Sequence, residues 1–166
     1  MGSGDEFAAF YAGYGRRLLH LAQLLTGNAD YAEDLLQDVL SRAYARWDRI
    51  RVQDPYIYVR RGLVNARTDR WRRRVPVPNV IREGELVFRD HASDVVRHDD
   101  LLRALQTLTL RERTVIALRF FEDLSEKQTA AALGVPPGTV KSATNRAVVK
   151  LRQHPALQSY LVGDPL

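Results

Sequence analysis

Residues 125–151 read SEKQTAAALGVPPGTVKSATNRAVVKL, and this stretch decides the fold of the C-terminal part of the chain. Ser125 and Gln128 have the spacing of a capping box, in which a hydroxyl and an amide each pair with a backbone N–H group at a helix start. Gly134 suits the left-handed residue that ends a helix, and the prolines at 136 and 137 prevent the helix from continuing while suiting a new first turn. The stretch therefore predicts two helices joined by a tight turn.

The second helix of this pair separates an inner face from a polar face. Apolar side chains recur at spacings of three and four residues, which places them on the inner face: Val140, Ala143, Ala147 and Leu151. The side chains left outside are Lys141, Ser142, Asn145, Arg146 and Val149. Cations and small polar groups of this kind reach phosphates and base edges in a major groove. A helix-turn-helix that reads DNA is thus favoured, although such a pair also occurs as plain structural packing.

The composition is that of an intracellular binding protein. The 166 residues are 45% hydrophobic, enough for one or two small domains. The formal net charge of +5 favours an anionic partner such as nucleic acid, the alternative being a basic surface kept for solubility. Cysteine is absent, which excludes disulfides and thiolate metal sites. No apolar run approaches the roughly 20 residues that span a bilayer, and no secretion signal is visible, so a cytoplasmic location is predicted.

The N-terminal part is predicted to contain two amphipathic helices. The first, 7–25, carries an apolar stripe of Phe7, Phe10, Tyr11, Tyr14, Leu18, Leu21 and Leu25. The second, 31–47, is expected to start at a cap of Asp30 with Glu33 and to bury Ala32, Leu35, Leu36, Val39, Leu40, Ala43 and Trp47. Its opposite face is acidic and polar, including Asp34, Gln37 and Asp38. By itself this face indicates either a solvated surface or a contact with a partner.

A third helix, 54–74, combines arginines with aromatic residues. Asp54 is the expected cap and Pro55 the first helical residue. Tyr56, Ile57, Val59, Leu63, Val64 and Ala66 are expected inside. Seven arginines stand among residues 60–74 with only Asp69 opposing them, a charge density that favours a nearby anion. Aromatic rings beside arginines are the surface on which single-stranded bases stack, whereas the alternative is a basic surface helix with its rings in the core.

The rest of the chain divides it into two domains. Residues 75–98 lack a periodic stripe and are predicted to be a flexible linker between domains at 5–74 and 99–153. In the second domain Thr109 and Glu112 form another capping box, followed by core residues expected at Val115, Ile116, Leu118, Phe120 and Phe121. After residue 152 a short fraying tail is expected. No phosphate-binding loop, nucleophile motif or histidine pair at metal spacing is present, so neither an enzyme nor a metal or cofactor site is predicted.

Three segments in this order resemble the extracytoplasmic-function (ECF) sigma factors of bacterial RNA polymerase, most closely the actinobacterial members. The segments are AEDLLQDVLSRAYARW, DPYIYVRRGLVNARTDRWRRR and LTLRERTVIALRFFEDLSEKQTAAALGVPPGTVKSATNRAVVKLR. The resemblance covers almost the whole chain. It implies an all-α protein of two domains that binds core polymerase, directs it to promoters and assists DNA melting, with an anti-sigma protein as a further partner.

The resemblance also assigns roles to residues. Contact with the clamp helices of the largest polymerase subunit is implied for Asp34, Gln37 and Asp38. Contact with the melted minus-ten element is implied for Arg49, Arg51, Gln53, Tyr58, Arg60, Arg61, Asn65, Arg67, Arg70 and Trp71. Reading of the minus-thirty-five duplex is implied for Thr139, Lys141, Ser142, Asn145 and Arg146.

Two positions depart from the family pattern, in which serine often stands at Pro136 and arginine at Ala143. The first departure removes a helix-capping hydroxyl. The second departure implies either that a phosphate or base contact is absent or that Asn145 and Arg146 contribute more to recognition of the DNA sequence. Two other functions remain as alternatives: a helix-turn-helix regulator that binds duplex DNA as a dimer without polymerase, and an adaptor whose acidic and tyrosine-rich helices serve only protein contacts.

Overall fold

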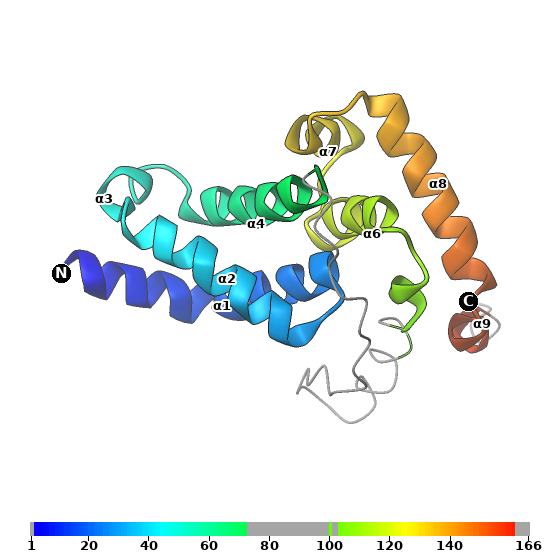
Figure 1. Cartoon of the computed structure of the whole chain (residues 1–166), viewed down its shortest axis with the longest axis horizontal. Coiled ribbons are helices and arrows are strands. Elements are labelled where there is room, and N and C mark those ends of the chain that lie inside the picture. The colour runs from blue at the N-terminus through cyan, green and yellow to red at the C-terminus, as the bar shows by residue number, and fades with distance from the viewer. Residues whose placement is uncertain (1, 73–99, 101–102, 162–166) are drawn as a thin grey trace. The chain divides into compact units, whose positions relative to one another are not determined.

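The described part of the chain is helical and forms two compact units (Figure 1). The structure, a computed structural model, describes residues 2–72, 100 and 103–161, so the predicted linker at 75–98 lies outside the described residues. Unit 1 is formed by the described residues before this gap and unit 2 by those after it. None of the described helices has the length and apolar character needed to cross a membrane. The expected all-α class with two small domains is confirmed.

Unit 1 contains α1 (Ser3–Thr26), α2 (Ala29–Tyr44), α3 (Trp47–Ile50) and α4 (Pro55–Arg72). Gly27 ends α1 with a left-handed φ of 68°, and its N–H group donates to the Gln23 carbonyl at 2.7 Å, so the chain reverses at once into α2. The helices α1, α2 and α4 pack against one another (Figure 1). Their shared core is formed by fully or almost fully buried side chains: Leu18, Leu21, Leu25, Leu36, Val39, Val59, Leu63 and Val64.

An aromatic cluster closes one end of unit 1. Trp47 is buried, and its ring centroid lies 5.1 Å from that of Phe7 and 5.4 Å from that of Phe10. Tyr44 contacts Phe7 edge-on at 5.0 Å. Because Trp47 begins α3 and anchors it on α1, the predicted continuous helix over 31–47 is wrong: α2 ends at Tyr44 and the chain turns.

Three further predictions for unit 1 are corrected. Asn28, not Asp30, caps α2, because its Oδ1 accepts from the Tyr31 N–H at 2.8 Å. Tyr11 and Tyr14 were expected in the core but are 43% and 47% exposed, since the inner stripe of α1 is already filled by smaller aliphatic side chains and Phe10. Ile57 is likewise exposed rather than buried.

The helices α2 and α4 of unit 1 approach each other closely at Gly62 of α4. A Cβ atom built on Gly62 would lie 2.6 Å from Cγ1 of Val39 on α2, nearer than real Cβ atoms come to a neighbour. Val39 is buried, so it has little room to move away. The glycine therefore sets how closely α2 and α4 pack.

Unit 2 contains a short helical stretch at 103–106, then α6 (Leu110–Ile116), η1 (Ala117–Phe121), α7 (Glu126–Leu133), α8 (Pro137–Gln153) and α9 (Pro155–Leu161). A core cluster of Val115, Ala130, Val140 and Ala143 joins α6, α7 and α8. The segment predicted as a fraying tail is instead the helix α9, which packs against α8.

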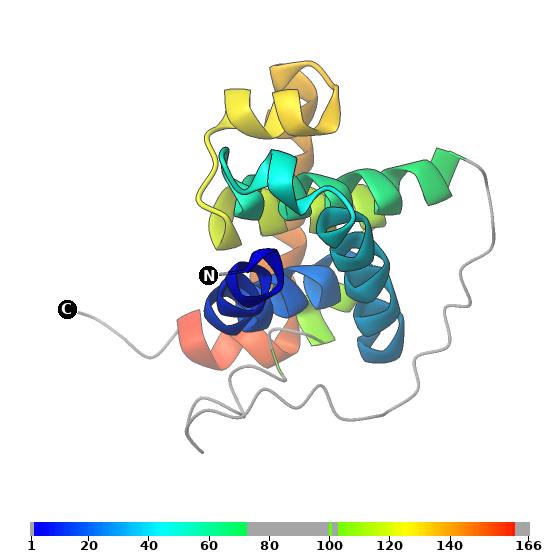
Figure 2. The ribbon, with the colours of Figure 1, turned by 90° about the vertical axis from the view of Figure 1, so that its left-hand side faces the viewer.

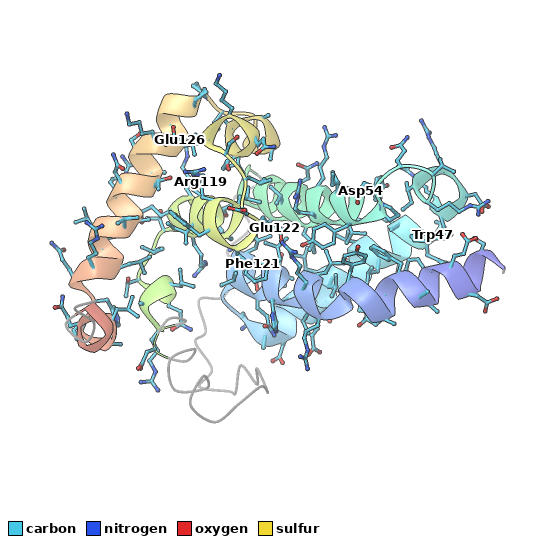
Figure 3. All side chains as sticks on the ribbon, turned by 180° about the vertical axis from the view of Figure 1, so that it is seen from behind. Trp47, Asp54, Arg119, Phe121, Glu122 and Glu126 are labelled. Atoms are coloured by element: carbon cyan, nitrogen blue, oxygen red, sulfur yellow. The ribbon has the colours of Figure 1, made fainter. Side chains whose placement is uncertain are left out.

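A π-helical turn, η1, interrupts unit 2 between α6 and α7. The Glu122 N–H donates to the Ala117 carbonyl at 3.0 Å, five residues back instead of four. Leu118, three residues after the buried Val115, is fully buried, whereas Phe120 is 61% exposed. The prediction that Phe120 belongs to the core is therefore wrong. Arg119, Phe121 and Glu122 come from this turn and its end (Figure 3).

Candidate nucleic-acid interface

The turn between α7 and α8, drawn as a ribbon in Figure 2, is held by local hydrogen bonds, as the sequence predicts. Ser125 and Gln128 form the expected capping box: the Ser125 N–H donates to the Gln128 side chain at 2.8 Å, and the Gln128 N–H donates to Ser125 Oγ at 3.2 Å. Gly134 ends α7 with φ 65°, and the Val135 N–H donates to the Ala130 carbonyl at 3.1 Å. Pro136 takes the position before α8, with Pro137 as its first residue. The expected helix-turn-helix is confirmed.

The polar face of α8 is exposed along most of the helix. Lys141, Ser142, Asn145 and Arg146 are exposed, and Thr139 is half-buried. The Ser142 hydroxyl donates to the Gly138 carbonyl at 2.7 Å, so in this rotamer its proton is directed to its own helix. A donor bond from Ser142 to phosphate requires the hydroxyl to rotate.

Ala143 belongs to the core of unit 2, not to the polar face. It is fully buried in the cluster with Val115, Ala130 and Val140. The interpretation that alanine here replaces a DNA-contacting arginine is therefore corrected, because a side chain at this position points into unit 2. The sequence left two alternatives for this position, an absent DNA contact or a larger share of base recognition by Asn145 and Arg146, and the role of these two residues stays a prediction.

A buried carboxylate lies beneath the basic side of α8. The side chain of Glu112 on α6 is 4% exposed, and its oxygens lie 2.8 and 3.0 Å from Nζ of Lys150 and 3.7 Å from Nε of Arg146. The Thr109 N–H also donates to it at 2.9 Å, which completes the predicted capping box. Burial acts to raise the pKa of Glu112, but the hydrogen bonds from Lys150 and Thr109 outweigh it and lower the pKa below its ordinary value. The sequence indicated Glu112 only as a cap.

In unit 1 the start of α4 follows the prediction. Asp54 Oδ1 accepts from the Ile57 N–H at 3.1 Å and so caps the helix, with Pro55 as its first residue. Trp47 begins the short α3, and Asp54 follows α3 in the chain; both are labelled in Figure 3. Arg61 and Asn65 are exposed, and Tyr58, one turn earlier on the same face, is half-buried, as is Arg60. The Arg46 guanidinium approaches the Tyr58 hydroxyl at 3.5 Å.

Arg67 is the clearest correction among the predicted DNA contacts. Its side chain is buried, its Nε donates to the Leu25 carbonyl at 3.2 Å, and its guanidinium lies 5.8 Å from the ring centroid of Tyr31. It therefore ties α4 to the end of α1 rather than facing a phosphate. The spacing of 59, 63 and 67 shows why: Arg67 continues the stripe of Val59 and Leu63, a signal already present in the sequence.

The segment before α4 exposes its predicted base-reading side chains. Arg49 and Gln53 are exposed. Arg51 is exposed as well, but its Nη1 lies 3.0 Å from a carboxylate oxygen of Glu6 and its Nε 3.4 Å from Asp48. These ion pairs fix the segment to α1 and compete with any phosphate for Arg51. Arg70 and Trp71 lie in the last turns of α4, and their side chains are outside the described residues.

The acidic face of α2 is exposed. Asp34, Gln37 and Asp38 all lie on the side opposite the buried stripe. Next to them a groove of about 260 Å³ is lined by Phe7, Tyr11, Gln37, Leu40, Ser41 and Tyr44. The two tyrosines of this groove are 43% and 54% exposed. The sequence did not indicate the groove, because the apolar stripe of α1 predicted that Tyr11 would be covered.

Comparisons with known proteins agree with this arrangement. The model of Sigma-70 region 2 matches residues 10–76, and the model of Sigma-70 region 4 matches residues 98–151. The chain is 37% identical to the RNA polymerase sigma-E factor of Streptomyces coelicolor, over 92% of this chain and 88% of that protein. It is 30% identical to the ECF RNA polymerase sigma factor SigM of Mycobacterium tuberculosis, over 90% of this chain and 78% of that protein.

A solved structure shows the same fold. The sigma factor RpoE of Bartonella quintana, crystallised in complex with the anti-sigma factor NepR, superposes with a TM-score of 0.67 over 96% of this chain and 99% of that chain, at 24% identity.

An exposed acidic helix, a helix that carries arginines and aromatic residues, and a separate helix-turn-helix define a transcription-initiation protein of the Sigma-70 class. The chain belongs to the ECF RNA polymerase sigma factors, with relatives among the actinobacteria, as the sequence predicts. Its function is that of a sigma factor, which directs RNA polymerase to promoters.

Proposed function

We propose that each domain of this sigma factor holds one promoter element, with polymerase bound to the first domain and no covalent chemistry performed by the chain itself. In this proposal the domains are residues 5–74 and 99–153, joined by 75–98. The observation that carries it is the separation of three exposed surfaces: the acidic face of α2, the cationic face of α4 and the polar face of α8. The protein works in the cytoplasm, where polymerase and DNA are found.

The acidic face of α2 is the proposed contact with the clamp helices of the largest polymerase subunit. Asp34, Gln37 and Asp38 are exposed, so replacing these side chains removes no buried contact from unit 1. Carboxylates on an interface rim steer association with a basic partner and set its salt dependence. If this face were only solvated, reversing its charge would leave the affinity for core polymerase unchanged.

The face of α4 and the segment before it are proposed to hold the melted minus-ten strand. The residues available for it are Arg49, Gln53, Tyr58, Arg60, Arg61 and Asn65, with Arg51 shared between DNA and Glu6. Guanidinium groups bind phosphates, and aromatic rings stack on unpaired bases. Arg67 is left out of this set because it is buried.

The polar face of α8 is proposed to read the minus-thirty-five element as duplex DNA. Lys141, Asn145 and Arg146 supply exposed donors, and Thr139 stands near the N-terminus of the helix, which is the end that enters a major groove. An asparagine suits adenine and an arginine suits guanine as bidentate partners.

Reconstitution with core polymerase tests the proposal. Wild-type protein should give a promoter-specific transcript, whereas Asp34→Lys or Asp38→Lys should lose affinity for core polymerase. Neutral variants supply a matched control: Asp34→Asn and Asp38→Asn should weaken core binding, whereas Asp123→Asn removes a carboxylate from an exposed residue of unit 2 and keeps a side chain that tolerates its left-handed φ of 55°. Equal core binding by all variants would reject the polymerase face. Tight operator binding without polymerase would instead favour the stand-alone regulator.

An anti-sigma protein is the proposed regulatory partner. The fold is shared with a sigma factor that was crystallised with such a partner. Co-purification of the tagged chain from its native cell should recover a protein that competes with core polymerase. Recovery of the chain only as free protein or on polymerase would argue against this partner.

A further inference from the structure

We propose that Glu112 is a positioning and specificity-determining residue for DNA recognition by α8: it keeps Lys150 away from the DNA backbone and orients Arg146 toward the bases. The proposal rests on the role of α8 in reading the upstream element. It assigns a function to a residue that does not lie on the exposed face of the recognition helix. Glu112 acts through the two cations that it contacts.

The side chain of Lys150 is 42% exposed, but its ammonium group is held against the protein by this carboxylate. Its ammonium group donates to both oxygens of Glu112, at 2.8 and 3.0 Å. If Lys150 turned to a phosphate, it would leave a carboxylate that is 96% buried without its closest counter-charge, and uncompensated buried charges are strongly unfavourable. One cation of α8 is therefore withheld from binding phosphates, the interaction that attracts a protein to any DNA sequence.

Arg146 is treated differently by the same carboxylate. Its Nε lies 3.7 Å from Glu112 Oε1, while the side chain remains 59% exposed. The contact is made through Nε of the guanidinium. The planar fork that recognises O6 and N7 of guanine thus stays available, but its orientation is restricted. An arginine restricted to one orientation cannot move to whichever phosphate is nearest, so a contact with one base is favoured over contacts with phosphates.

The capping role of Glu112 can be separated from its charge. Glu112 is the last residue of the capping box at the start of α6, where its side chain accepts from the Thr109 N–H. Glutamine also serves at this position of a capping box. Glu112→Gln therefore keeps the cap and removes the charge that holds Lys150 and Arg146.

The test measures how salt weakens binding of reconstituted holoenzyme to a promoter duplex. Each phosphate contact contributes about 0.9 to the slope of log affinity against log salt concentration. Glu112→Gln releases about one cation, so its slope should steepen by about 0.9, and a fourfold rise in salt should cost it about 3.5-fold more affinity than wild type. The double variant Glu112→Gln/Lys150→Met should return to the wild-type slope.

A second measurement compares a matched with a scrambled upstream element. In Glu112→Gln, affinity for the scrambled element should rise, because the released Lys150 binds any phosphate. The ratio of the matched to the scrambled affinity should fall, because Arg146 is no longer restricted to one orientation. An unchanged slope and an unchanged ratio would overturn the proposal.

Lys150→Met in the wild-type background keeps the test decisive if Glu112→Gln folds poorly. It should leave the slope unchanged, and a slope shallower by about 0.9 would show that Lys150 already contacts DNA and would overturn the proposal. Arg146→Ala separates this outcome from the proposed function. If Arg146→Ala does not alter use of the matched element, the role of α8 fails, whatever Glu112 does.

Discussion

Replacing Gly62 by alanine should weaken unit 1 by forcing α2 and α4 apart. The added Cβ would lie 2.6 Å from Cγ1 of Val39, whose side chain is 2% exposed. Valine in a helix has one strongly preferred rotamer, so Val39 cannot turn aside without strain. The two helices that carry the proposed polymerase and minus-ten surfaces must then shift relative to each other.

The expected loss follows from two opposing effects. Adding a methyl group to a well-packed core costs about 1–3 kcal/mol. Alanine in place of glycine in a helix returns about 0.8–1 kcal/mol. The net change should be a decrease of up to about 2 kcal/mol in the free energy of unfolding of unit 1.

Tryptophan fluorescence during urea unfolding provides a selective assay, because the two tryptophans stand at positions 47 and 71, both before the second domain. Gly13→Ala is the matched control: no heavy atom lies within 4 Å of its added Cβ, so this variant should be as stable as wild type or more so. Adding Val39→Ala to Gly62→Ala should remove the clash and make the two losses less than additive. If Gly62→Ala proves as stable as Gly13→Ala, the argument from close helix packing is refuted.

Three predictions concern unit 2, each measured by circular dichroism during unfolding. Gly134→Ala should destabilise by about 1–2 kcal/mol because Gly134 has a left-handed φ of 65°, whereas Gly138→Ala, where the added Cβ also meets no neighbour, should be neutral or stabilising. The pKa of Glu112 is lowered, so its contribution to stability is present above its ordinary pKa of 4.5 and is lost as the pH falls through the lowered pKa. The difference in free energy of unfolding between wild type and Glu112→Gln should therefore shrink on acidification, and a difference that widens would contradict this. Leu118→Ala should cost about 2–5 kcal/mol and Phe120→Ala less than about 0.5 kcal/mol, and comparable losses would refute the register assigned to the π-helical turn.

Features set by neighbouring residues could be predicted from the sequence. The capping boxes at Thr109 and Ser125, the cap at Asp54 and the helix end at Gly134 all agree with the structure. Each depends on a hydrogen bond or a backbone angle within about four residues, so the information is local. The helix-turn-helix and the all-α class follow from them.

Features that depend on packing between distant segments could not be predicted in the same way. The end of α2 at Tyr44 is decided by the contact of Trp47 with α1, more than 35 residues earlier. Burial of Arg67 depends on a carbonyl at Leu25. The link between Glu112 and Arg146 likewise joins two helices that are far apart in sequence. The roles in binding polymerase and DNA come from the family and stay predictions at the level of single residues.

The π-helical turn at Ala117–Phe121 affects how sequences of relatives should be aligned. A π turn holds one residue more than the α turn that it replaces. A relative with an uninterrupted α-helix here should therefore align with a one-residue gap inside the helix, not in the loop before α7. An ungapped alignment would place the residues after the turn one position out of register and so transfer the wrong residues from one protein to the other.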